Sequence, residues 1–201
     1  MSEQPSLTTR ILHAGLATGV SVQLLVSLFM ERPGHHGEAL TRIQAAGFDV
    51  HETVGLLVLP LTVAWFAWLF ARRRESGPRT LFPWFSTVQR RELFAALRGA
   101  LGAAWRRRMP AESDTEVIAP AVHGLGALCA LGMAFSGTLV WLGMSEQGQL
   151  TAWAHDLLEV HETVASLMWA YLIGHTAMAM LHQFNGQSSI SRMLSFRSSE
   201  T

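Results

Sequence analysis

The sequence predicts an all-α fold, a transmembrane four-helix bundle whose termini both lie in the cytoplasm. Hydrophobic residues make up 49% of its 201 residues and charged residues only 15%, a composition more apolar than that of most soluble domains. Four apolar stretches are each about long enough to cross the hydrocarbon core of a bilayer as a helix. They cover approximately residues 11–30, 50–70, 119–144 and 153–181.

The first stretch is expected to remain in the protein as a membrane span. It is as long as a span, opens with a histidine and lacks the small-residue pattern of a signal-peptide cleavage site. We therefore expect one four-helix domain over residues 1–185, with an inner loop at residues 71–118. The polar, serine-rich residues 186–201 predict a flexible cytoplasmic tail.

Arginines supply all fifteen basic residues of the chain, and their distribution predicts its orientation. Ten of them lie in the loop between the second and third stretches, whereas the other two loops contain only Arg32 and Arg42. Because cytoplasmic loops of membrane proteins are enriched in basic residues, both termini and the long loop are expected on the cytoplasmic side. We interpret these arginines as topology signals rather than as a site that recognises anionic lipid or nucleic acid.

Part of the inner loop predicts an interfacial helix on the cytoplasmic surface of the membrane. Between Val88 and Trp105, apolar residues recur at a helical period and arginines stand between them, a pattern typical of a helix lying on lipid. The preceding aromatic run, residues 82–85, favours an anchor in the interfacial zone. Docking of a partner subunit on the same segment is an alternative that the sequence leaves open.

A pentapeptide that occurs twice is the most distinctive feature of the sequence. Val-His-Glu-Thr-Val stands at residues 50–54 and again at residues 160–164. Histidines inside membrane helices are costly unless they have a partner, so they mark functional sites. His161 and His175 are fourteen residues apart, which puts them about 40° apart around a helix and about 21 Å apart along it. One face of the fourth span thus carries two candidate ligands near opposite membrane surfaces.

Depth in the membrane pairs the histidines, because consecutive spans run in opposite directions. His51 and His161 both lie near the outer surface, and His13 lies near the inner level that His175 reaches. Two neutral imidazoles fill both axial positions of a haem iron and suit it to electron transfer. These pairs predict an outer and an inner haem. The 110-residue offset of the pentapeptides relates His13 to His123, which is a rival inner ligand, and we favour His13.

Other polar groups have two possible roles. Arg10 and Arg72 on the inner side, and Arg42 on the outer side, are candidate partners of haem propionates, or they mark the water boundary. Glu52 and Glu162 suit proton transfer in quinone chemistry, or they lie hydrated at the outer interface. A transporter or channel that binds divalent cations or relays protons through these histidines and glutamates is the alternative function.

Four spans, the positions of their histidines and the arginine-rich inner loop together resemble the bacterial cytochrome b561 and nickel-iron-hydrogenase b-type cytochrome superfamily, over roughly residues 8–185. The resemblance rests on His13, His51, His161 and His175. It implies a dihaem b-type cytochrome of the bacterial inner membrane that carries electrons between a donor or partner redox subunit and the quinone pool. Two haem b groups are the implied cofactors, and quinone, a redox subunit and lipid the implied partners. Whether the chain is itself a quinone-linked oxidoreductase or a subunit of one is left open, as is its oligomeric state.

The resemblance is incomplete at two points. The inner loop is unusually long for this superfamily, and no quinone-site motif is matched in the sequence.

Overall fold

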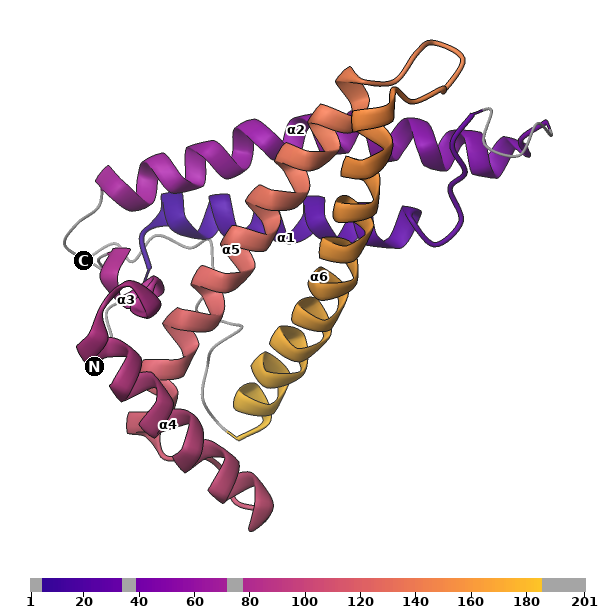
Figure 1. The fold of residues 1–201 in the computed structure, drawn as a ribbon. Coiled ribbons are helices and arrows are strands. Elements are labelled where there is room, and N and C mark those ends of the chain that lie inside the picture. Colours follow the sequence, from indigo (N-terminus) through magenta and orange to yellow (C-terminus); the bar gives the residue numbers. More distant parts are fainter. Residues whose placement is uncertain (1–4, 34–38, 72–77, 186–201) are drawn as a thin grey trace. The chain divides into compact units, whose positions relative to one another are not determined.

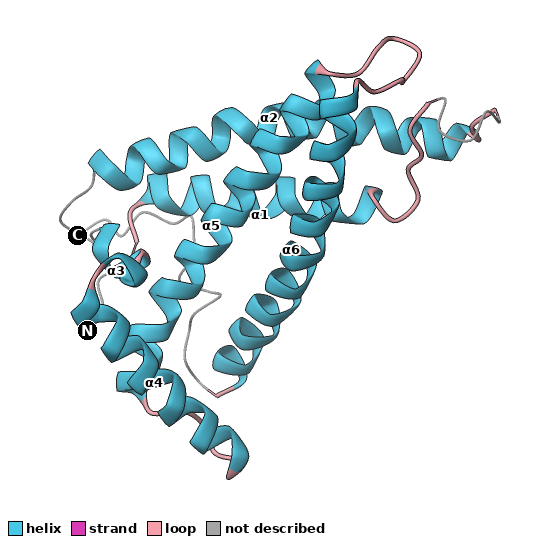
Figure 2. Ribbon diagram, in the orientation of Figure 1, coloured by secondary structure: helices cyan, strands magenta, loops and turns pink. Residues whose placement is uncertain are grey.

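The structure is a computed structural model that describes residues 5–33, 39–71 and 78–185, and these residues form helices and no strand (Figure 1, Figure 2). An all-α fold was predicted, and the described residues confirm it. The helices are α1 (Leu7–Val26), α2 (Arg42–Ala71), α3 (Pro78–Leu81), the 3₁₀ helix η1 (Pro83–Phe85), α4 (Thr87–Trp105), α5 (Glu112–Leu142) and α6 (Ala152–Phe184).

Four of these helices, α1, α2, α5 and α6, are long and apolar enough to cross a membrane, which confirms the four predicted spans. The end of α1 and the starts of α2 and α5 differ from the predicted bounds. α1 ends at Val26 rather than at Met30, because the backbone then forms turns, with the Leu28 amide donating to Leu25 O. α2 and α5 begin earlier than predicted, because polar turns precede their apolar parts and hydropathy reports only the latter.

The chain forms two compact units, and each has its own packing. The first unit comprises Met1–Trp65 and Cys129–Thr201, and the second comprises Phe66–Leu128. The first unit therefore contains α1, α6, most of α2 and the end of α5. The second contains the end of α2, α3, η1, α4 and the start of α5.

Side chains from three spans form the core of the first unit. Leu24 of α1, Ala130 of α5 and Met168 of α6 are almost completely buried, and partly buried apolar residues of the same helices pack around them. α1 also lies directly beside α2 (Figure 1). A Cβ atom on Gly19 of α1 would lie 2.8 Å from Val58 Cγ2 of α2. A glycine there permits the close approach of these two helices, as small residues do in membrane bundles.

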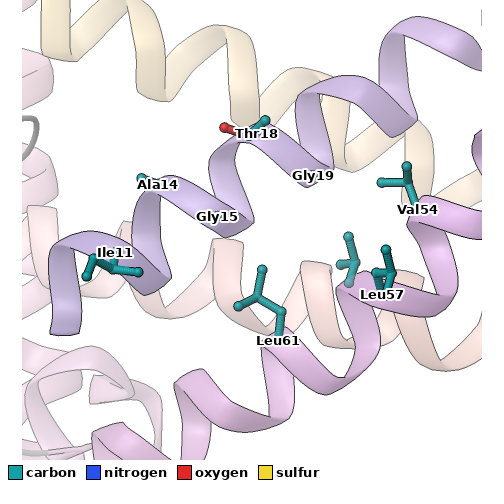
Figure 3. A pocket seen from close by; sticks show the side chains of 9 residues that line it. Ile11, Ala14, Gly15, Thr18, Gly19, Val54, Leu57 and Leu61 are labelled. Carbon is teal, nitrogen blue, oxygen red and sulfur yellow. The ribbon is translucent and has the colours of Figure 1, made fainter.

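An apolar groove of about 540 Å³ runs between α1 and α2 in the first unit (Figure 3). Thr18 is its one polar side chain. Such a lining suits contact with lipid chains, since it offers them almost no hydrogen-bonding group. The lining residues are Ile11, Ala14, Gly15, Thr18, Gly19, Val54, Leu57, Val58 and Leu61.

In the first unit, the segment that follows α1 contacts the α5–α6 loop. Arg32, which follows α1, donates a hydrogen bond from Nη1 to the carbonyl oxygen of Gly148 in the α5–α6 loop. Gly148 has a φ of 76°, a left-handed conformation that costs glycine little. A Cβ atom on Gly148 would also collide with the carbonyl oxygen of Pro33. Glycine at this position is therefore required both by conformation and by space.

Aromatic packing organises the second unit. Phe82 stacks on Phe66 of α2, with ring centroids 6.3 Å apart, and contacts Trp84 edge-on at 6.0 Å. Phe82 and Pro83 are buried, whereas Phe85 is 85% exposed. Phe82 and Pro83 thus pack inside the unit, and the position of the aromatic run in the interfacial zone stays a prediction.

α4 occupies the segment in which an amphipathic helix was predicted. Its apolar side chains are mostly exposed, and Trp105 at its end is 92% exposed. Ala96 is its one buried residue. The helix itself is thus confirmed, while its location on a membrane surface stays a prediction. The exposed apolar residues are Val88, Phe94, Leu97, Leu101 and Trp105.

Candidate functional site

His51 of α2 and His161 of α6 lie next to each other in the first unit. Their ring centroids are 6.2 Å apart and their ring planes are nearly perpendicular, at 84°. Both side chains are half-buried. The two copies of the repeated pentapeptide therefore place their histidines on facing helices.

A second pair is formed by His13 of α1 and His175 of α6. Their ring centroids are 6.4 Å apart, with an interplanar angle of 54°. Tyr171, one turn before His175, stacks on its ring at 5.4 Å and 11°. An aromatic contact of this kind restricts the rotation of the imidazole. α6 thus contributes one histidine to each pair, as the fourteen-residue spacing predicted.

The spacing within each pair fits one metal ion bound by two imidazoles. A bond of about 2 Å from each ring nitrogen to a metal between the rings would set the ring centroids roughly 6.3 Å apart. A direct hydrogen bond of about 2.9 Å between facing nitrogens would bring them to roughly 5 Å. The centroid distances of 6.2 and 6.4 Å agree with the first arrangement. Both pairs are therefore compatible with the axial ligation of a haem iron.

Gly137 of α5 makes room for the His161 ring. A Cβ atom on Gly137 would lie 2.9 Å from Cε1 of His161, closer than ordinary side-chain contacts allow. Gly132, on the same helix, has nothing within 4 Å of such an atom. The His161 imidazole can take its observed position because residue 137 has no side chain. The same requirement does not apply to every glycine of α5.

We expect Gly137→Ala to weaken binding at the His51/His161 pair. The added methyl group forces the imidazole to move, and overpacking of this kind costs about 1–3 kcal/mol, or about 5- to 150-fold in cofactor affinity. Haem content of the protein purified in detergent measures the effect. Gly132→Ala is the matched control and should keep the content of the unsubstituted protein. Equal haem loss in both variants would contradict the role of Gly137.

Of the other predicted residues, the structure describes Arg10, Arg42 and His123. Arg10 is only 6% exposed and precedes His13 by one turn of α1, whereas Arg42 is exposed at the start of α2. Arg72 lies outside the described residues. His123 lies on α5 in the second unit, with Nδ1 2.6 Å from the carbonyl oxygen of Ala119. The preference for His13 over His123 stays a prediction.

Three contacts near His51 and His161 were not predicted. Trp141 donates from Nε1 to Glu52 Oε1 at 2.9 Å, Gln23 donates from Nε2 to the carbonyl oxygen of His51 at 2.8 Å, and Ser136 Oγ lies 2.9 Å from Nδ1 of His161. Gln23 and Ser136 are polar residues inside apolar spans, and that isolation is the signal by which sequence could have identified them. Their partners could not be identified, because the rotation of each helix was unknown.

Four membrane-spanning helices and two facing histidine pairs define a helical membrane protein with sites suited to axial metal ligation. A family model described as prokaryotic cytochrome b561 matches residues 5–196. The chain belongs to this family, and the predicted resemblance is confirmed. It is thus a multi-pass membrane cytochrome that carries b-type haem and transfers electrons. Searches of curated proteins and of solved structures found no match.

Proposed function

We propose that the protein is a dihaem b-type cytochrome that carries electrons across the bacterial inner membrane between a donor or partner redox subunit and the quinone pool. The observation that carries the proposal is the presence of two histidine pairs with nearly the same centroid distance, 6.2 and 6.4 Å. One helix, α6, contributes to both pairs at positions about 21 Å apart along its axis. This separation suits two cofactors near opposite membrane surfaces.

Four histidines would hold the two haems. His51 and His161 would bind the outer haem, and His13 and His175 the inner one. Haem b, when bound, supplies one-electron redox chemistry at its iron. With two histidines at each haem, these side chains would favour electron transfer over the binding of oxygen. Tyr171 would keep the plane of the His175 ring fixed through stacking.

Arginines would complement the propionates of the haems. Arg10 is buried and lies one turn from His13. Its guanidinium would bind a propionate of the inner haem in a charge-assisted contact. Arg72 is the further candidate on the inner side and Arg42 the candidate on the outer side.

The membrane arrangement that we propose follows from charge and exposure. The arginine-rich loop and both termini face the cytoplasm, and α4 lies on that surface with its exposed apolar residues in the lipid. Arg91 and Arg98 flank Phe94, Leu97 and Leu101 along this helix. Their charged groups would lie at the level of the headgroups while the apolar side chains enter the acyl region.

Quinone exchange is tested with the protein in liposomes that contain a quinone. Under anaerobic conditions, we expect quinol to reduce the haem, and oxidised quinone to reoxidise it, as followed by the absorption of the reduced haem. Dithionite is the control, because it reports all of the haem that can be reduced. A haem that dithionite reduces but that exchanges electrons with neither quinol nor quinone would contradict the proposed substrate.

A further inference from the structure

His51 and His161 occupy the same position in the repeated pentapeptide, yet their rings have different neighbours. Nδ1 of His161 lies 2.9 Å from Oγ of Ser136, a residue of α5 that is 6% exposed. Nδ1 of His51 is buried and has no hydrogen-bond partner among the residues that the structure describes. Identical local sequence has therefore produced two chemically different imidazoles.

The contacts of Ser136 determine the direction of its hydrogen bond with His161. Ser136 Oγ lies 2.7 Å from the carbonyl oxygen of Gly132, which can only accept a hydrogen bond. The single hydroxyl hydrogen therefore goes to this carbonyl, one turn earlier in the helix. Oγ must then accept from His161, whose Nδ1 carries the hydrogen. The lone pair of this imidazole consequently resides on Nε2, the nitrogen left to bind a metal.

His51 is positioned in another way. Gln23 of α1 donates from Nε2 to its backbone carbonyl at 2.8 Å. The Gln23 amide fits because α2 has a glycine one turn later: a Cβ atom on Gly55 would lie 2.7 Å from Nε2 of Gln23. This contact fixes the helix that carries His51, and Nδ1 of the imidazole has no hydrogen-bond partner among the described residues.

We propose that Ser136 is a positioning residue that holds His161 as an Nε2 ligand and makes the two axial ligands of the outer haem unequal. The inference rests on the proposed ligation by His51 and His161. A ligand whose Nδ1–H is hydrogen-bonded is fixed in tautomer and orientation and is a stronger electron donor to the metal. Ser136 therefore stabilises the oxidised iron and lowers the reduction potential of the outer haem.

The role of Ser136 is tested by measuring the reduction potential of the outer haem. In a redox titration, this haem is the component that His161→Ala removes. Ser136→Ala should shift this potential upward and change the EPR g-values of the oxidised haem. Ser136→Thr keeps a hydroxyl and should restore both. Thr138→Ala is the matched control, since Thr138 also donates to the carbonyl one turn earlier, at Ala134, in the same helix. It should leave the potential unchanged.

Each outcome decides the inference. Loss of the outer haem in Ser136→Ala, with retention in Ser136→Thr and Thr138→Ala, would support it, since only the hydroxyl that contacts His161 would then matter. An unchanged potential in Ser136→Ala, or an equal shift in Thr138→Ala, would overturn it. If His161→Ala kept both haems, the ligand assignment itself would fail. If His161→Ala lost one haem and Ser136→Ala had no effect, the inference about Ser136 alone would fail.

Discussion

Replacing His161 with alanine is expected to remove the outer haem, so that the purified protein carries about one haem per chain instead of about two. The physical reason is the loss of one of two axial ligands, since His161 lies opposite His51 with 6.2 Å between the ring centroids. The effect is measured as pyridine haemochrome per protein. In the optical and EPR spectra, one of two low-spin components should disappear.

His155 provides the control for this substitution. It lies on the same helix but is exposed, and it does not share the face that His161 and His175 occupy. His155→Ala should therefore keep about two haems per chain and both low-spin components. Retention of both components in His161→Ala, or an equal loss in His155→Ala, would refute the assignment of the outer ligands.

Replacing His13 with alanine is expected to remove the inner haem, whereas replacing His123 should leave about two haems per chain. His13 faces His175 at a centroid distance of 6.4 Å, which matches the spacing of the outer pair. His123 instead has Nδ1 close to the carbonyl oxygen of Ala119 in its own helix. Haem content and the number of low-spin components distinguish the two variants.

The comparison between His13 and His123 decides a choice that the sequence left open. Loss of the inner haem in His123→Ala, with retention in His13→Ala, would show that His123 is the ligand and that our preference is wrong. His175→Ala serves as the reference, because it defines the signal of the inner haem. Loss of a different component in His13→Ala than in His175→Ala would contradict their pairing.

The length and hydropathy of the spans were predictable from sequence, because a bilayer requires a long apolar helix for each crossing. The same information could not locate the helix ends. The polar turns at the start of α2 and α5 continue the helical hydrogen bonding beyond the apolar part. α4 was predictable for a related reason, since its apolar residues recur at the helical period.

Much of the candidate site could also be predicted, because histidine is conspicuous inside an apolar helix. Alternating span direction and the fourteen-residue spacing were enough to predict that His51 lies beside His161 and that His13 lies beside His175. The contacts of Ser136, Gly137 and Gln23 could not be predicted. Each depends on the rotation of one helix against another, and sequence periodicity describes each helix only by itself.

The repeated pentapeptide illustrates this limit. Its two copies suggest equal roles for His51 and His161, and the two rings do face each other. The difference between them comes from residues outside the repeat, Ser136 on one side and Gln23 on the other. The local sequence is the same around both histidines, whereas residues of neighbouring helices give the two histidines different contacts.

The number and type of haems bound by the purified protein tests the central claim most directly. We predict a pyridine haemochrome spectrum of b type and about two haems per chain, with low-spin absorption in both the oxidised and the dithionite-reduced protein. A fully loaded protein with a single haem would contradict the dihaem assignment. A protein that binds no haem when the cofactor is supplied in excess would contradict the account as a whole.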